Sequence, residues 1–237
     1  MNQLKNVLFF LMYIVANPRL TTLIFRGVYL PTYIQCEWLR QFDIKTVIDV
    51  GAYVGNFSKA LSIVIPGVKI YSLEPIAKYS RIIKDKNIPN CVVVRAAANN
   101  RNGSALFYES SFPPASSLLP LKKEFRDKFP LKVKKEVQIL TLNSYFGKRK
   151  LERKVFLKID VQGMELNVLK GASKILDKID IIYVETAREG IYQGEPNFSE
   201  VYSYLIKRGF RYFGEMLESE FYPNFGLKRY SNSLFLK

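Results

Sequence analysis

Apolar segments of two kinds alternate along the chain from Thr46 onward. Short runs rich in β-branched residues predict strands at 46–50, 69–75, 91–98, 155–160 and 179–186. Apolar residues at helical spacing predict helices at 56–65, 77–87, 164–176 and 198–209, and residues 210–217 and 231–237 are further strand candidates. Strands that alternate with helices indicate βαβ units. We therefore expect an α/β fold whose mostly parallel sheet is covered by helices on both faces.

Two regions depart from this alternation. Residues 1–45 show helical spacing and are expected to form an N-terminal helical extension in front of a domain that spans 46–237. Residues 99–154 are expected to be an insertion, partly a β-hairpin, that covers the site. Within the extension, Val7 to Ala16 is an apolar run of ten residues, whereas a membrane-spanning helix needs about 20. We expect this run to pack on the domain or to lie on a membrane surface.

The composition excludes several catalytic mechanisms and metal sites. The 237 residues contain no histidine, so they cannot build a Ser-His-Asp or Cys-His mechanism or a histidine-ligated metal site. The two cysteines, Cys36 and Cys91, lack metal-ligand spacing, and we predict no metal. Acid–base work falls to Asp, Glu, Lys, Tyr or Cys. The net charge is +15, with twelve Lys or Arg against four Asp or Glu in residues 122–154, which suits nucleic acid, an anionic membrane or an acidic substrate.

The loop after the first predicted strand has the spacing D-x-G-x-x-x-G, in which Asp49 precedes Gly51 and Gly55. Ligands of open α/β sheets bind at this end of the strands, where glycines let the backbone turn tightly and approach them. The dinucleotide spacing G-x-G-x-x-G is missing, and the acid would repel a pyrophosphate. Glu74 ends the next strand, where an acid typically accepts hydrogen bonds from ribose hydroxyls.

These features fit S-adenosyl-L-methionine, which carries a ribose and a charged amino-acid end but no phosphate. The alternative is that the glycines only serve a tight turn. We predict that residues at the ends of the first three strands bind the cofactor, namely Asp49, Gly51, Ala52, Tyr53, Gly55, Asn56, Glu74 and Ala97.

The segment FLKIDVQGMELNVLKGA, residues 156–172, resembles the signature LKIDVQGxExxVLKGA of the FkbM-type S-adenosylmethionine-dependent methyltransferases. Further pieces match in order, namely VIDVGAYVGNFS (47–58), SLEP (72–75), SSLLP (116–120), YVET (183–186) and LIKRGF (205–210). The resemblance extends from Thr46 to the end of the chain. It implies a Rossmann-like domain with a seven-stranded sheet, and it implies O-methylation, often of sugar hydroxyls in glycans or natural products.

Two positions depart from the family pattern. Asn143 stands in TLN where relatives usually carry TLD, and Asn232 stands in NSLF where they usually carry an aspartate. An amide oxygen still accepts a hydrogen bond, so a structural role would survive the exchange. A role in holding charge or a metal would be reduced.

Methyl transfer to oxygen requires that the acceptor hydroxyl is aligned with the methyl group and loses its proton. Asp160 ends the fourth predicted strand, and we predict that it accepts the hydrogen bond of this hydroxyl; the alternative is that it organises the loop or contacts the cofactor's amino group. Glu185 ends the neighbouring strand, so the two acids could share a hydroxyl or a divalent cation. Glu165 is expected to favour the N-terminus of its helix rather than face the site, and Lys158 to reach the surface.

Three other functions compete with this prediction. The charge favours a nucleic-acid methyltransferase, but FPPA (112–115) lacks the acid and the aromatic residue of amino-directed DNA enzymes, and neither cysteine follows a proline as in cytosine-C5 enzymes. The second is a non-catalytic basic module that binds membrane surfaces. The third is a nicotinamide dehydrogenase, which the loop spacing disfavours. We expect a cytoplasmic enzyme with a small-molecule or glycan acceptor, and peripheral contact with a membrane or an anionic glycan is a further expectation.

Overall fold

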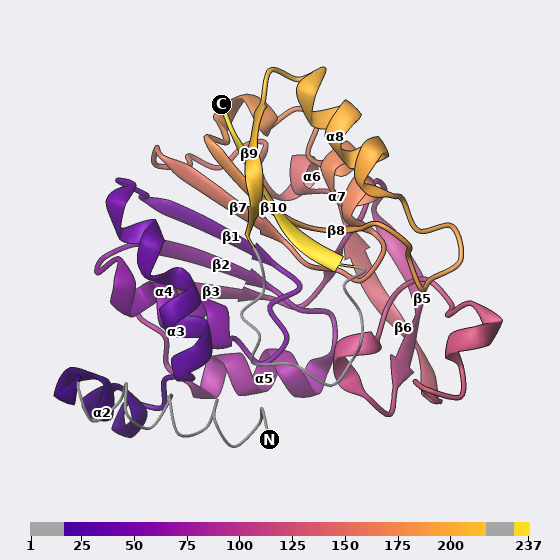
Figure 1. Ribbon diagram of the computed structural model, residues 1–237, viewed down its shortest axis with the longest axis horizontal. Coiled ribbons are helices and arrows are strands. Elements are labelled where there is room, and N and C mark those ends of the chain that lie inside the picture. The colour runs from indigo at the N-terminus through magenta and orange to yellow at the C-terminus, as the bar shows by residue number, and fades with distance from the viewer. Residues whose placement is uncertain (1–16, 217–229) are drawn as a thin grey trace, which may run out of the picture.

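The computed structural model describes residues 17–216 and 230–237 (Figure 1). Its main sheet has seven strands in the order β3-β2-β1-β7-β8-β10-β9. They are β1 (Thr46–Val50), β2 (Lys69–Leu73), β3 (Cys91–Val94), β7 (Val155–Ile159), β8 (Ile181–Ala187), β9 (Arg211–Met216) and β10 (Tyr230–Leu236). The first five run parallel, whereas β10 is antiparallel to both of its neighbours. The expected Rossmann-like, seven-stranded and mostly parallel α/β sheet is confirmed.

The strand order reverses between β1 and β7. From β1 the chain continues to β2 and β3 on one side of the sheet, and it returns through β7 and β8 on the other side. Val50 lies in register with Ile159, so the two central strands end at the same level. Ligands of open α/β sheets bind outside the carboxyl ends of the strands at such a switch point. The fold therefore places the loops after β1 and β7 where a ligand is expected.

Helices cover both faces of this sheet (Figure 1). One face is covered by α2 (Pro18–Phe25), α3 (Leu30–Cys36), the 3-10 helix η1 (Glu37–Gln41), α4 (Asn56–Val64) and α5 (Ala77–Asp85). The other face is covered by α6 (Leu142–Phe146), α7 (Glu165–Gly171) and α8 (Phe198–Ile206). Side chains alternate across a strand, so Phe156 enters the first core while Leu157 enters the second.

The predicted insertion, 99–154, forms a second, smaller sheet together with the two residues that precede it. Its strands are β4 (Ala97–Ala98), β5 (Gly103–Ser110) and β6 (Leu131–Leu140), and two 3-10 helices, η2 (Pro113–Ala115) and η3 (Lys123–Phe125), lie between the last two. β5 and β6 form the expected antiparallel hairpin. The strand predicted at 91–98 is divided, because its last two residues leave the main sheet and pair with β6. Helix α6 belongs to the main core, where Leu142 and Phe146 are fully buried, so the separate sheet ends before it.

Residues 17–45 form the expected helical extension. Cys36 and Leu39, from α3 and η1, are fully buried in the core under the main sheet, so the extension is packed on the domain. The apolar run from Val7 to Ala16 lies outside the described residues. Among the residues that are described, no helix has the length and apolar character needed to cross a membrane.

Candidate active site

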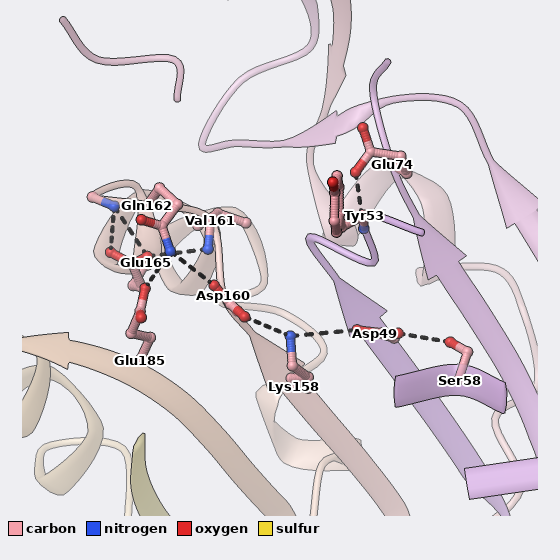
Figure 2. Close-up of polar contacts among 11 residues, drawn as sticks. Asp49, Tyr53, Ser58, Glu74, Lys158, Asp160, Val161, Gln162, Glu165 and Glu185 are labelled. Atoms are coloured by element: carbon pink, nitrogen blue, oxygen red, sulfur yellow. Dashed lines mark hydrogen bonds and ion pairs between the residues drawn. The ribbon is translucent and has the colours of Figure 1, made fainter. Parts of the chain in front are cut away.

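The loop after β1 is held by a carboxylate from the neighbouring strand. Gly51 (φ +84°) and Gly55 (φ +76°) adopt left-handed conformations that suit glycine, and Tyr53 (φ +47°) adopts one as well. The N–H of Tyr53 donates to Oε2 of Glu74 at 3.0 Å, and the N–H of Ile76 donates to Oε1 at 2.8 Å. Burial raises the pKa of the Glu74 carboxyl to about 8, although these N–H groups favour its charged form. Glu74 thus fixes the loop (Figure 2), and it also lines the cavity beside it.

A second carboxylate holds the loop after β7. Glu165 is the first residue of α7, as predicted, and it does not line the cavity. Its carboxylate accepts hydrogen bonds from the N–H groups of Val161 at 3.2 Å and Gly163 at 3.1 Å. The side chain is buried, and burial raises its pKa to about 8. Glu165 therefore organises the loop that follows Asp160.

The two loops touch at Gly51. A Cβ atom built on this glycine would lie 1.8 Å from the carbonyl oxygen of Asp160, so no other residue fits without a shift of the backbone. The N–H of Asp160 in turn donates to the carbonyl oxygen of Val50 at 3.0 Å. The two loops consequently form one continuous surface at the switch point.

Lys158 lies between two acids, and the prediction that it reaches the surface is wrong. Only 8% of the residue is exposed, and Nζ lies 3.0 Å from Oδ2 of Asp160 and 3.7 Å from Oδ1 of Asp49 (Figure 2). Because helices cover both faces of the sheet, a side chain that points away from one core enters the other. Burial opposes the ammonium charge, but Asp160 and Asp49 outweigh burial and raise the pKa of Lys158. Lys158 therefore stays charged and links the strands beneath both loops.

Asp49 lies beneath the glycine loop rather than in the cavity. It is fully buried, and its Oδ2 accepts a hydrogen bond from Oγ of Ser58 at 2.6 Å. Its Oδ1 has no hydrogen-bond partner among the described residues. Burial raises the pKa of Asp49, and the charge of Lys158 opposes this shift. Asp49 therefore supports the loop from inside the core. Its carboxylate does not reach the cavity where the predicted contact with the cofactor would be made.

Gly55 is also absent from the described lining of the cavity. A Cβ atom at Gly55 would lie 3.0 Å from Cγ1 of Ile83, so this glycine lets α4 approach α5 closely. Its place in the sequence motif is thus explained by packing between helices, and the contact with the cofactor stays a prediction.

Gln162 joins the two predicted catalytic acids. Its Nε2 donates to Oδ1 of Asp160 at 3.1 Å and to Oε2 of Glu185 at 2.7 Å (Figure 2). The hydroxyl of Tyr192, which is fully buried, donates to Oε1 of the same amide at 3.0 Å and so fixes its orientation. Oγ of Ser117, from the predicted insertion, donates to the backbone oxygen of Gln162 at 2.6 Å. An amide donor thus lies between the acids, at the position that a shared cation would need.

A cavity of about 1470 Å³ opens beside both loops. Its lining includes six of the eight predicted cofactor residues and both predicted catalytic acids, namely Gly51, Ala52, Tyr53, Asn56, Glu74, Ala97, Asp160 and Glu185. Small-molecule sites usually have volumes of about 300–1,000 Å³. The cavity therefore has room for a cofactor and an acceptor together.

The cavity is acidic although the protein is strongly basic. Among the described residues, its lining contains four acids (Glu74, Asp160, Glu185 and Glu215) and two bases (Lys158 and Arg188), so acids outnumber bases even when Glu74, with its raised pKa of about 8, is protonated. Such a wall attracts a cation and repels a phosphate. A carboxyl group at the end of β2 can in addition accept hydrogen bonds from a ribose. The residues present therefore fit S-adenosylmethionine, with its sulfonium charge and its ribose.

The two asparagines that replace family acids have different surroundings. Oδ1 of Asn143 accepts a hydrogen bond from the N–H of Lys174 at 2.9 Å, and its Nδ2 donates to Oγ of Ser173 at 3.1 Å. This is a structural role that an amide can fill. Asn232 lies opposite Glu185 in the antiparallel pairing of β10 with β8, and it lines the cavity. The second departure from the family pattern therefore lies at the site itself.

Comparison with known proteins assigns the family. The family model described as "Methyltransferase FkbM domain" matches residues 49–212. Among solved structures, a protein from Nostoc punctiforme assigned as an O-methyltransferase is 10% identical, with a TM-score of 0.50, over 87% of this chain and 56% of that chain. The plantazolicin methyltransferase BpumL in complex with SAH is 10% identical (TM-score 0.49; 87% and 82% covered). Precorrin-6y C5,15-methyltransferase from Geobacter metallireducens is 12% identical (TM-score 0.48; 87% and 86% covered).

Structural likeness at such low identity shows the fold alone, and no curated protein matches the chain in sequence. The assignment instead depends on the family match, which covers both loops of the site and most of the chain. The chain therefore belongs to the FkbM methyltransferase family, and its methyl donor is S-adenosylmethionine.

Proposed function

We propose that this methyltransferase transfers the methyl group to a hydroxyl oxygen of a sugar-containing acceptor, either a small molecule or a glycan. The observation that carries the proposal is the pair of carboxylates, Asp160 and Glu185, held together by the amide of Gln162 at the cavity wall. Carboxylate oxygens accept hydrogen bonds from hydroxyl groups, and a sugar offers several hydroxyls to one pair of acids. The family resemblance, which implies O-methylation, supports the same reaction.

S-adenosylmethionine supplies an activated methyl group on a positively charged sulfur. The chain must then orient the acceptor hydroxyl and take its proton while the oxygen–methyl bond forms and the sulfur–methyl bond breaks. Asp160 is the residue that we assign to this proton. Its Oδ2 lies 3.0 Å from Nζ of Lys158 and its Oδ1 accepts from Gln162, so the carboxylate is held in one orientation. Each oxygen keeps a further lone pair for the acceptor.

The basic segment 122–154 is separate from this chemistry. Among the described residues, none of its lysines or arginines belongs to the cavity lining. The acidic wall supports a neutral or cationic acceptor over a phosphate-rich one, which disfavours nucleic acid. We propose that the segment serves peripheral contact with an anionic glycan or a membrane surface, and that the enzyme acts in the cytoplasm, where S-adenosylmethionine is made.

The variant Asp160→Asn tests the assigned base. We expect turnover to fall by about 10²–10⁴-fold, the usual contribution of a general base, while calorimetry finds the affinity for S-adenosylmethionine within a few-fold of the original. Asp127→Asn, which changes an exposed acid of the predicted insertion, is the matched control and should keep full turnover. Full activity of Asp160→Asn would contradict the assignment.

The acceptor class needs its own measurement. We would incubate the protein with methyl-labelled S-adenosylmethionine and glycan extracts, and map the product by mass spectrometry. A methyl ether on a sugar ring is the expected product. Label that enters RNA, DNA or protein and leaves the glycans unlabelled would overturn the proposed acceptor.

A further inference from the structure

Part of the cavity wall comes from residues that precede the family match. The match begins at residue 49, whereas α3 and η1 end at Gln41. These two helices contribute Thr32, Gln35 and Trp38 to the lining. This added wall belongs to the same cavity as the methyl-donor loops. The extension is therefore positioned to contact a ligand of the reaction.

Trp38 belongs to a row of aromatic rings that crosses strands β8 and β7 next to Lys158. Its ring centroid lies 6.2 Å from that of Tyr183 on β8, and Tyr183 lies 6.2 Å from Phe156 on β7. Tyr183 is in register with Lys158 and precedes Glu185 by two positions, so both β8 side chains point to the same face of the sheet. The row thus runs directly beside the residues that hold Asp160.

Trp38 and Tyr183 are half-buried and line the cavity, so their rings combine apolar surface with access from the cavity. Polar side chains lie around them, with Thr32 and Gln35 on α3 and Asn232 on β10. A pyranose ring has the complementary chemistry: an apolar face of C–H groups and hydroxyls around its edge. Aromatic rings bury apolar surface efficiently, and a few polar groups around them fix the orientation of a ligand.

We propose that Trp38 and Tyr183 form the acceptor subsite and receive the C–H face of a pyranose ring, so that one ring hydroxyl reaches Asp160. This inference rests on the proposed function, because it names the residues that select the sugar for that reaction. The N-terminal extension accordingly contributes Trp38 to acceptor specificity, while the matched domain contributes Tyr183 and carries the methyl transfer.

Trp38 is the single tryptophan of the chain, so its fluorescence reports directly on this subsite without any turnover. The protein, with and without S-adenosylmethionine, is titrated with methyl hexosides and methyl 6-deoxyhexosides, and with phenol as a flat aromatic probe. We expect the fluorescence of Trp38 to change in a saturable way with at least one glycoside. A response to phenol together with no response to any glycoside would overturn the sugar class.

Substitution then tests the residues themselves. Trp38→Ala and Tyr183→Ala should each raise the KM for the acceptor by about tenfold or more, corresponding to the loss of one good contact. Trp38→Phe, which keeps an aromatic ring, should recover most of that loss. Phe25→Ala is the matched control, because Phe25 lies in the same extension, is 93% exposed and does not line the cavity. Calorimetry should give each variant the original affinity for S-adenosylmethionine, which shows that the fold is intact.

The two proposals can fail separately. If the original protein methylates no sugar-containing acceptor, neither a glycoside nor a glycan, the proposed function is wrong. If it methylates such an acceptor and the KM of Trp38→Ala and Tyr183→Ala equals that of Phe25→Ala, only the subsite is wrong.

Discussion

The loops after β1 and β7 share the same backbone features but have different roles at the cavity. Each contains one residue other than glycine in the left-handed region, Tyr53 (φ +47°) in the first and Gln162 (φ +57°) in the second. Each is closed by a buried glutamate that accepts hydrogen bonds from two backbone N–H groups, and in each burial raises the pKa of that glutamate to about 8. The sequence separation differs, because Glu74 comes from the next strand and Glu165 from the loop's own helix.

The difference lies in what else the glutamate touches. Glu74 lines the cavity, so the same carboxyl that fixes the first loop is available to a ligand. Glu165 does not line it, and its role ends with the backbone of the second loop. The acid of that loop that lines the cavity is Asp160, which Gln162 and Lys158 hold. The first loop is thus organised to bind, and the second to present an acid.

The largest expected effect comes from the contact between the loops. Gly51→Ala would place Cβ 1.8 Å from the carbonyl oxygen of Asp160, which neither backbone can accommodate. We expect a loss of more than about 5 kcal/mol in the free energy of unfolding, or no folded protein, measured by urea denaturation. Gly67→Ala is the control: Gly67 has a similar φ of +86° and nothing within 4 Å of its Cβ position, so only about 1–2 kcal/mol of conformational strain applies. Equal losses in the two variants would show that the loops do not depend on this contact.

Lys158 is the second link between the loops, and its removal should have the next largest effect. Lys158→Met leaves Asp49 fully buried without its counter-ion, which typically costs about 3–5 kcal/mol. Lys45→Met is the control, because Lys45 forms an exposed ion pair with Asp43 whose loss costs about 0–1 kcal/mol. Adding Asp49→Asn to Lys158→Met should restore part of the lost stability, measured as the coupling in a double-mutant cycle. Additive losses would mean that the two charges are not coupled.

Lys158 also shows where sequence reasoning stops. The alternation of strands and helices was sufficient to predict the parallel sheet, and a strand that ends in an acid was sufficient to place Asp160 and Glu185 beside one cavity. Whether a lysine within a strand reaches solvent depends on what covers that face of the sheet. The extension formed by α3 and η1 covers the face that Lys158 enters, and no local pattern of the strand contains that information.

Gln162 and Asp49 show the same limit of sequence patterns. The motif places Asp49 next to the glycine loop, but the turn at Gly51 carries the backbone above the carboxylate, so the acid supports the loop from below. Gln162 bridges two acids only because it adopts a left-handed conformation before Gly163, and Tyr192 then orients its amide. These contacts arise from tertiary packing between segments far apart in sequence, which a spacing motif does not encode.

Removing Glu74 and Glu165 one at a time should distinguish a residue that binds the cofactor from one that only orders its loop. Glu74→Ala and Glu165→Ala each deprive two backbone N–H groups of their acceptor, so both should lose about 1–3 kcal/mol of stability per group left unsatisfied. Only Glu74 also lines the cavity. Glu74→Ala alone should therefore lower the affinity for S-adenosylmethionine, measured by calorimetry, by about tenfold or more. Glu165→Ala should instead reduce turnover at saturating cofactor, because the loop that presents Asp160 loosens. An equal loss of cofactor affinity in both variants would remove the distinction between the loops.

The most selective test is a pH dependence. Burial raises the pKa of both Glu74 and Glu165 to about 8 from the ordinary value of 4.5, so the folded protein binds more protons than the unfolded chain between those pH values. Their contribution to stability is therefore fully present below about pH 4.5 and is lost as the pH rises toward 8, which urea midpoints at pH 5, 7 and 9 would detect.

The charged form of Glu74 is also the better acceptor for ribose hydroxyls and the better partner for a cation, so S-adenosylmethionine affinity should rise as the pH increases from 7 to 9. The rise can reach at most about tenfold per pH unit and should level off above the pKa. Glu74→Gln should abolish it, whereas Glu165→Gln should keep it, because only the first residue meets the cavity. Titration of the cofactor itself is common to all three proteins and cancels in the comparison. A rise that survives in Glu74→Gln would assign the titration to another group and leave the two glutamates with the same purely structural role.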